Sequence, residues 1–348
     1  MKILKSLLFA LCVFCAMPDA GACSRVVYQG DSGLVLVGRT LDWRTPIPTN
    51  LYVYPRGVAR QSMPSGPRLQ WTSRYASVLA VGYDGGVTEG MNERGLVMNG
   101  LFCKGTIYRT ADSDSTSEIP VVSLAMFVSW FLDNFATVAE VDDWLRTADF
   151  AVYGQSFDGG TASTLHWAVT DATGDNLLIE YTAGIMRTYR GRDLTVLTND
   201  PPHPQMEAIE AYWRTIGGTN MLPGTVRSAD RYVRASYFIG HVPKGYAFPE
   251  AFASLSGIMG VVSVPFGYEL PGEPNVSSTQ WTSVSDATSK CYWFRQATAI
   301  SYLYIDLEGL SLSKGSPILK LDMARYGNST SGCANALMVV SPGFTPMW

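Results

Sequence analysis

The sequence predicts an α+β protein, a four-layer αββα sandwich in which two sheets pack face to face and helices cover their outer sides. The first observation is the order of the patterns: strands, a helical block, more strands, a second helical block and strands again. The second is the composition, because 47% hydrophobic and 16% charged residues suit a globular protein with a large core. No linker, charge run or repeat divides residues 23–348, so we expect one domain after a leader at residues 1–22.

The first two strand patterns form a hairpin. Residues 24–29 and 34–42 each alternate in the manner of a strand, and the glycines and polar residues at 30–33 favour a tight turn. Further strands are expected at residues 51–54, 77–83 and 95–102, with a glycine-rich loop between the last two.

Helical periodicity begins after these strands. Residues 119–147 predict one or two helices, in which Val138, Val141 and Leu145 recur at i, i+3 and i+7. Turn chemistry at residues 171–175 marks a second hairpin. The strands of this meander are expected at residues 164–170, 176–181, 185–189 and 194–197. The second helical block is expected at residues 204–213, 229–239 and 249–258. The last strands are expected at residues 280–285, 291–297 and 302–307.

The first 22 residues have the pattern of a secretory leader. Lys2 and Lys5 form a positive region, residues 6–17 are apolar, and Ala-Gly-Ala at 20–22 is a small-residue cleavage site. We therefore expect cleavage before Cys23 and an exported protein, periplasmic or secreted and bacterial, with no stable membrane insertion once the leader is removed.

Cleavage at this site gives Cys23 its chemistry. A free α-amine with a pKa of about 8 can serve as the general base for the thiol of the same residue. Opposed residues of the first hairpin have numbers that sum to about 63, so Cys23 faces Thr40 and lies near Arg39 and Asp42. We expect Arg39 to lower the pKa of the thiol below its free value of about 8.5, and Asp42 to orient the amine.

Two alternatives to a nucleophilic Cys23 stay open. The first is lipidation, which would make the chain an exported binding protein without catalysis; however, a lipoprotein leader normally has Leu where this chain has Ala20. The second is a disulfide between Cys23 and one of Cys103, Cys291 and Cys333, which also remain after cleavage. If Cys23 is a nucleophile instead, the other three allow at most one bridge and a free thiol.

Charge and histidine content argue against other classes of protein. The formal net charge is −4 and the Lys and Arg residues are scattered, so we expect no nucleic-acid partner. His166, His203 and His241 have no metal-ligand spacing, so we expect no metal and no cofactor. His166 alternates with apolar neighbours and is interpreted as a sheet histidine, whereas the prolines around His203 indicate a loop.

Six segments in order carry a family resemblance: CSRVVYQGDSGLVLVGRTLDW from Cys23 onward, MNERGLVMNG, LHWAVTDATGDNLLIEY, LTNDPP, LPGTVRSADRYVRASYF and QWTSVSDATSKCYWFR. With them, nearly all of residues 23–348 resembles the choloylglycine hydrolase family, N-terminal nucleophile amidases that include penicillin V acylases and conjugated bile acid hydrolases. The resemblance implies the αββα fold of N-terminal nucleophile hydrolases and cleavage of a linear carbon–nitrogen amide bond through a thioester on Cys23. It also allows a homotetramer.

The resemblance also assigns the site residues. It implies catalytic roles for Cys23, Arg39, Asp42, Asn199 and Arg231. An asparagine amide aimed at the oxyanion is worth about 3 kcal/mol in such reactions, and Asn199 suits that task. By local pattern alone, Asn199 is more often a turn residue, because Asn-Asp-Pro-Pro favours a turn, and Arg231 fits a solvated basic helix face equally well.

The acyl group of the substrate is expected to be apolar. Trp43, Tyr83 and Phe102 lie near the predicted site and would line its pocket. Phe102 stands where relatives of the bile salt hydrolases carry an asparagine, a departure that argues against bile salt specificity more than against catalysis. Three small-molecule amides remain candidate substrates: penicillin V, a bile acid conjugate and an N-acyl homoserine lactone.

Overall fold

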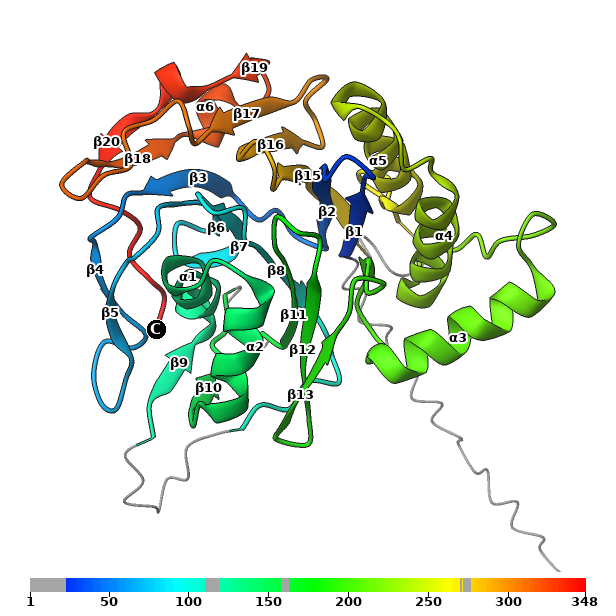
Figure 1. Cartoon of the computed structure of the whole chain (residues 1–348), viewed down its shortest axis with the longest axis horizontal. Coiled ribbons are helices and arrows are strands. Elements are labelled where there is room, and N and C mark those ends of the chain that lie inside the picture. Colours follow the sequence, from blue (N-terminus) through cyan, green and yellow to red (C-terminus); the bar gives the residue numbers. More distant parts are fainter. Residues whose placement is uncertain (1–22, 110–118, 158–162, 270, 272–276) are drawn as a thin grey trace, which may run out of the picture.

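Two large sheets lie face to face in the middle of the protein (Figure 1). The computed structural model describes residues 23–109, 119–157, 163–269, 271 and 277–348, and the predicted leader lies outside them. The seven-stranded sheet has the order β14 (Val196–Leu197), β1 (Ser24–Gln29), β2 (Val35–Trp43), β15 (Ser278–Asp286), β16 (Cys291–Gln296), β17 (Leu303–Asp306) and β19 (Gly332–Cys333). Its pairs are antiparallel except β17 with β19.

The second sheet has nine strands, all paired antiparallel. Their order is β13 (Ile185–Arg190), β12 (Asn176–Thr182), β11 (Leu165–Thr170), β8 (Val97–Phe102), β7 (Gly86–Asn92), β6 (Ser77–Gly82), β3 (Thr49–Tyr54), β18 (Ile318–Leu321) and β20 (Val339–Ser341). Two small ribbons pair β4 (Ala59–Gln61) with β5 (Gln70–Thr72) and β9 (Val121–Ser123) with β10 (Ala151–Tyr153).

Helices cover the outer side of each sheet. The nine-stranded sheet packs against α1 (Leu124–Asn134) and α2 (Val138–Thr147), and the seven-stranded sheet packs against α4 (Ser228–His241) and α5 (Phe248–Val262). In Figure 1, α4 and α5 lie beside β1 and β2, and α3 (His203–Ile216) extends next to α4. The predicted αββα sandwich is therefore confirmed. Smaller helical turns occur at α6 (Met323–Tyr326) and η1 (Asn335–Leu337).

The two faces of strand β2 pack into two different cores. Val35, Val37 and Leu41 point into the core between the sheets, whereas Leu36 points to the helices α4 and α5. Both faces of the strand are therefore buried, which explains the uninterrupted apolar run at residues 35–38. Cys23, directly before β1, packs into the same inter-sheet core.

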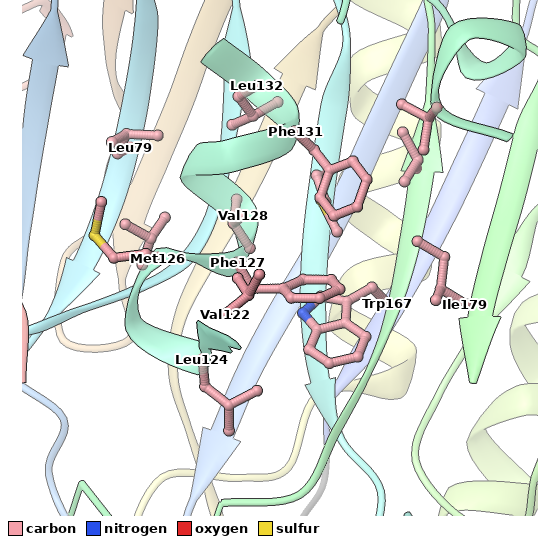
Figure 2. Packing of buried hydrophobic residues seen from close by; sticks show 14 of the residues in the cluster. Leu79, Val122, Leu124, Met126, Phe127, Val128, Phe131, Leu132, Trp167 and Ile179 are labelled. Carbon is pink, nitrogen blue, oxygen red and sulfur yellow. The ribbon is translucent and has the colours of Figure 1, made fainter. Parts of the chain in front are cut away.

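The outer core under α1 is aromatic. Figure 2 shows the Phe127 ring over Trp167 of β11, with centroids 4.0 Å apart and planes 24° from parallel. Phe131, one turn further along α1, has its centroid 5.1 Å from that of Phe127. These rings fix the helix on the sheet beside the strands that carry the site.

Two expectations for the fold are wrong. His203, expected in a loop, is the first residue of α3. Residues 86–92, predicted as part of a glycine-rich loop, form strand β7 in the middle of the nine-stranded sheet. Glycine is needed there for close packing: a Cβ at Gly90 would lie 2.4 Å from the Val78 carbonyl oxygen and 2.9 Å from Leu132 of α1.

The first hairpin differs from its prediction by one residue. Ser24 is paired with Thr40, so opposed numbers sum to 64 and the position opposite Cys23 moves to Leu41. Arg39 and Asp42 still flank that position. Among the described residues, no helix is both long enough and apolar enough to cross a membrane.

Candidate active site

A cavity of about 110 Å³ lies beside Cys23. The three aromatic residues predicted for the pocket, Trp43, Tyr83 and Phe102, all line it. Trp43 and Phe102 meet edge to face with ring centroids 5.2 Å apart. Other apolar lining residues are Leu41, Ile47, Val87, Leu124, Phe157 and Leu165. The cavity therefore suits an apolar group that ends at the thiol.

The thiol of Cys23 is buried, with 4% of the residue exposed. Its Sγ lies 4.0 Å from Nη2 of Arg39 and 3.9 Å from the carbonyl oxygen of Asp42. Burial raises the pKa of the Cys23 thiol, and the charge of Arg39 offsets only part of that rise. The expectation of a lowered pKa is therefore wrong, although Arg39 acts in the predicted direction. A thiol of this kind needs a base to become a nucleophile.

Asn199 and Arg231 hold the backbone of Cys23. The Cys23 nitrogen donates to Oδ1 of Asn199 at 2.6 Å, and Nη1 of Arg231 donates to the Cys23 carbonyl oxygen at 2.7 Å. Arg231 also donates to the hydroxyl of Ser24. The side chain of Arg231 is fully buried, so it does not belong to a solvated basic face. Both residues that only the resemblance linked to Cys23 are thus in contact with it.

The orientation of the Asn199 amide is defined by its partners. Oδ1 accepts from the Cys23 nitrogen and, at 2.8 Å, from Nη2 of Arg231, so oxygen rather than nitrogen faces these donors. Nδ2 donates to the carbonyl oxygen of Phe102 at 2.7 Å, which uses one of its two hydrogens. The Asn199 backbone nitrogen donates to Oγ of Ser228 at the start of α4. Residue 102 therefore takes part in the site through its backbone as well as its ring.

Asp42 is a buried carboxylate on β2. It accepts from Oγ1 of Thr279 at 2.6 Å and from Oγ1 of Thr40 at 3.2 Å. Burial raises the pKa of Asp42 to about 6, and the guanidinium of Arg231 offsets part of the rise. With residue 22 still attached, the Cys23 nitrogen is an amide and bonds to Asn199, so an Asp42–amine bond stays a prediction.

Glu89 is a site residue that sequence reasoning missed. This fully buried carboxylate on β7 lies 3.3 Å from Nε of Arg39 and accepts from Nδ2 of Asn99, Oγ of Ser283 and the hydroxyl of Tyr292. Arg39 in turn donates to the Gly100 carbonyl oxygen at 2.7 Å. An acidic residue between Val87 and Met91 in an apolar alternation is a signal that would have found it. The carboxylates of Asp42 and Glu89 thus lie near the guanidinium groups of Arg231 and Arg39 around Cys23.

Tyr83 reaches the cavity from an unusual turn. Tyr83 and Asp84 have φ of 54° and 49°, a left-handed conformation that residues other than glycine rarely adopt. The Asp84 carboxylate accepts from Nδ2 of Asn50 at 2.9 Å, the hydroxyl of Tyr52 at 3.0 Å and Nζ of Lys320 at 2.7 Å. These bonds stabilise the turn and with it the position of the Tyr83 ring.

The remaining cysteines take no part in this site. Cys103, Cys291 and Cys333 are free thiols in the part of the chain that the structure describes, as is Cys23. The described residues also contain no group of three or more acidic, histidine or cysteine side chains that could hold a metal ion.

Comparison with known proteins identifies the class. The fold is that of the N-terminal nucleophile hydrolases: the structure of penicillin V acylase from Agrobacterium tumefaciens superposes with a TM-score of 0.85 at 38% identity, over 93% of this chain and 99% of that one. A conjugated bile acid hydrolase mutant from Clostridium perfringens shares the fold with a TM-score of 0.71 at 22% identity, over 85% of this chain and 95% of that one.

Sequence comparison defines the family. Residues 23–320 match the model of linear amide C–N hydrolases, choloylglycine hydrolase family, and the chain belongs to that family of amide hydrolases. It is 34% identical to a penicillin V acylase of Pectobacterium atrosepticum over 87% of this chain and 85% of that protein. It is 26% identical to a bile salt hydrolase/transferase of Clostridium perfringens over 78% of this chain and 88% of that protein. These matches do not favour a binding protein without catalysis.

Proposed function

We propose that this protein cleaves a linear amide through a thioester on Cys23, after removal of residues 1–22 frees the α-amine of that cysteine. The observation that carries the proposal is the convergence on one residue. The Cys23 thiol opens on an apolar cavity, its nitrogen is held by Asn199, and its carbonyl group is held by Arg231. Asp42 and Arg39 lie on the adjacent strand.

Acylation begins with proton transfer inside Cys23. The α-amine takes the proton of the thiol, whose raised pKa keeps it protonated until a base acts. Sγ then forms a bond to the substrate carbonyl carbon, and the carbonyl electron pair moves to its oxygen. The second hydrogen of the Asn199 amide is the side-chain donor for this oxyanion. When the tetrahedral centre collapses, the carbon–nitrogen bond breaks and the α-ammonium returns its proton to the leaving amine.

Water completes the cycle. The neutral α-amine takes a proton from water, and the hydroxide oxygen adds to the thioester carbon. Collapse of the second tetrahedral centre breaks the carbon–sulfur bond, and the thiolate regains its proton from the ammonium. Asn199 accepts a hydrogen bond from this nitrogen through Oδ1, which leaves the nitrogen lone pair for the thiol and water.

A penicillin V acylase-like preference is the form of this activity we propose. The relatives named penicillin V acylase are 34% and 38% identical to the chain, against 26% for the bile salt hydrolase/transferase from Clostridium perfringens. Trp43, Tyr83 and Phe102 provide aromatic walls for an aromatic or aliphatic acyl group. A bile acid conjugate and an N-acyl homoserine lactone are the other candidates, since the same chemistry cleaves their amides.

The test starts from the leader-cleaved protein. Its turnover is measured on penicillin V, glyco- and tauro-conjugated bile acids and long-chain acyl homoserine lactones, beside Cys23→Ala as the matched control. We expect turnover of penicillin V, none in the control, and an intact mass that fits an unmodified N-terminal cysteine. A diacylglyceryl group on Cys23, or equal turnover in Cys23→Ala, would contradict the mechanism.

Two further properties belong to the proposal. Export follows from the leader pattern, and a homotetramer follows from the family resemblance. Cell fractionation of the native chain tests the first, and analytical ultracentrifugation of the cleaved protein tests the second.

A further inference from the structure

A buried histidine–glutamate pair lies behind Asn199. His166 on β11 is fully buried, and Glu180 on β12 is 3% exposed. Nδ1 of His166 lies 3.0 Å from Oε1 of Glu180, and Nε2 lies 2.7 Å from the carbonyl oxygen of Thr198, the residue directly before Asn199. The sheet histidine of the sequence pattern therefore touches the segment that carries a site residue.

Hydrogen-bond chemistry fixes what each ring nitrogen of His166 does. Nε2 faces a carbonyl oxygen, which only accepts, so Nε2 carries a hydrogen and donates it to Thr198. Nδ1 faces a carboxyl group, and two lone pairs at 3.0 Å would repel each other, so one hydrogen lies between Nδ1 and Glu180. Both ring positions are thereby occupied, and the ring is locked in one orientation.

Glu180 extends the contact to the other end of the same segment. Its two carboxyl oxygens accept from the backbone nitrogen of His203, the first residue of α3, at 3.0 and 3.2 Å. The pair therefore bonds to the chain at Thr198 and at His203, on either side of residues 199–202. Ser228 holds the Asn199 nitrogen from the side of α4, so the backbone around Asn199 is supported by the nine-stranded sheet and by a helix.

We propose that His166 and Glu180 are positioning residues for Asn199. They keep its amide aligned with the Cys23 nitrogen on one side and with the developing oxyanion on the other. The inference rests on the proposed function, because it assumes that the Asn199 amide acts on the reacting groups. Since an oxyanion donor acts on the transition state more than on bound substrate, a misaligned Asn199 lowers kcat and leaves KM nearly unchanged.

Two variants of one residue separate this role from general packing. Glutamine carries its amide at about the distance of Nε2 from the backbone and keeps a donor for Thr198. Asparagine carries its amide at about the distance of Nδ1 and keeps only the contact with Glu180. We expect His166→Asn to lower kcat about 10- to 100-fold and His166→Gln no more than about fivefold, with KM within about twofold in both.

The variants are compared as leader-cleaved proteins, with active sites counted by thiol titration and Asn199→Ala measured beside them. Equal losses in the two His166 variants, or wild-type kcat in His166→Asn, would overturn the inference while Asn199→Ala remains impaired. Wild-type kcat in Asn199→Ala would overturn the proposed function as well. Should His166→Asn not fold, Glu180→Met replaces it: a lower kcat at unchanged KM supports the positioning role, and wild-type kcat overturns it.

Discussion

Replacing Asp42 by asparagine should make the protein more stable at neutral pH. The carboxyl has a pKa of about 6 in the folded chain against an ordinary value of 3.8. At about 1.4 kcal/mol for each pH unit between these values, the ionised form costs roughly 3 kcal/mol of folding free energy. Asp42 is fully buried, so solvent does not screen this cost. Asparagine avoids it and can still bond to the Thr279 and Thr40 hydroxyls.

The stability gained by Asp42→Asn should increase as pH rises. Below about pH 3.8 the carboxyl is protonated in both the folded and the unfolded chain, so Asp42→Asn brings no advantage. As pH rises towards 6, the unfolded chain loses its proton first, and the wild type loses stability relative to the variant. Above about pH 6 the difference is complete, at roughly 3 kcal/mol.

Urea unfolding followed by tryptophan fluorescence measures this difference at pH 7.5 and at lower pH. The chain is kept uncleaved, so that the Cys23 nitrogen stays an amide and adds no charge beside Asp42. Asp149→Asn is the control, because the side chain of Asp149 is 64% exposed and should change little. A variant no more stable than wild type at pH 7.5, or a difference independent of pH, would refute the reasoning. After cleavage, the stabilised variant should have lost turnover.

Three further predictions concern the site. An extra residue kept before Cys23 should abolish turnover without changing the circular dichroism spectrum, and full activity would refute the α-amine base. Arg39→Ala should raise the pH at which iodoacetamide alkylates the Cys23 thiol. Glu89→Gln should lower that pH, because it removes the negative charge that offsets the charge of Arg39. Shifts of the same sign in the two variants would contradict this reasoning. Asp84→Gly keeps the left-handed turn but removes its three bonds, so KM for an apolar acyl substrate should rise about threefold to tenfold as Tyr83 loosens. An unchanged KM would show that the backbone alone positions the ring.

Local patterns were sufficient for much of the fold. The first strand lies at Ser24–Gln29 as expected, and the helices α3, α4 and α5 enclose the segments with helical periodicity. The glycines of strand β7 resemble those of a loop, so the sequence pattern did not predict the strand. Gly90 instead allows α1 and β6 to pack closely against β7. Glycine density alone does not distinguish these two causes.

Some residues of the site could be predicted from local sequence, whereas others depend on contacts between distant parts of the chain. The hairpin brought Arg39 and Asp42 near Cys23 from numbering alone, with an error of one residue. Asn199 and Arg231 are 176 and 208 residues from Cys23 along the chain, and no periodicity reports such a contact. Only the resemblance connected them. The pKa of the thiol was predicted in the wrong direction because burial, which exceeds the effect of Arg39, is not visible in the sequence.

These separations also determine when the protein can become active as it folds. The hairpin that places Arg39 beside Cys23 closes a short loop, but the contacts with Asn199 and Arg231 close loops that span more than half of the chain. Long-range contacts of this kind form slowly, after local structure has reduced the entropy of closure. A partly folded chain therefore carries an ordinary, unactivated thiol, and recovery of amidase activity on refolding should coincide with the slowest structural phase.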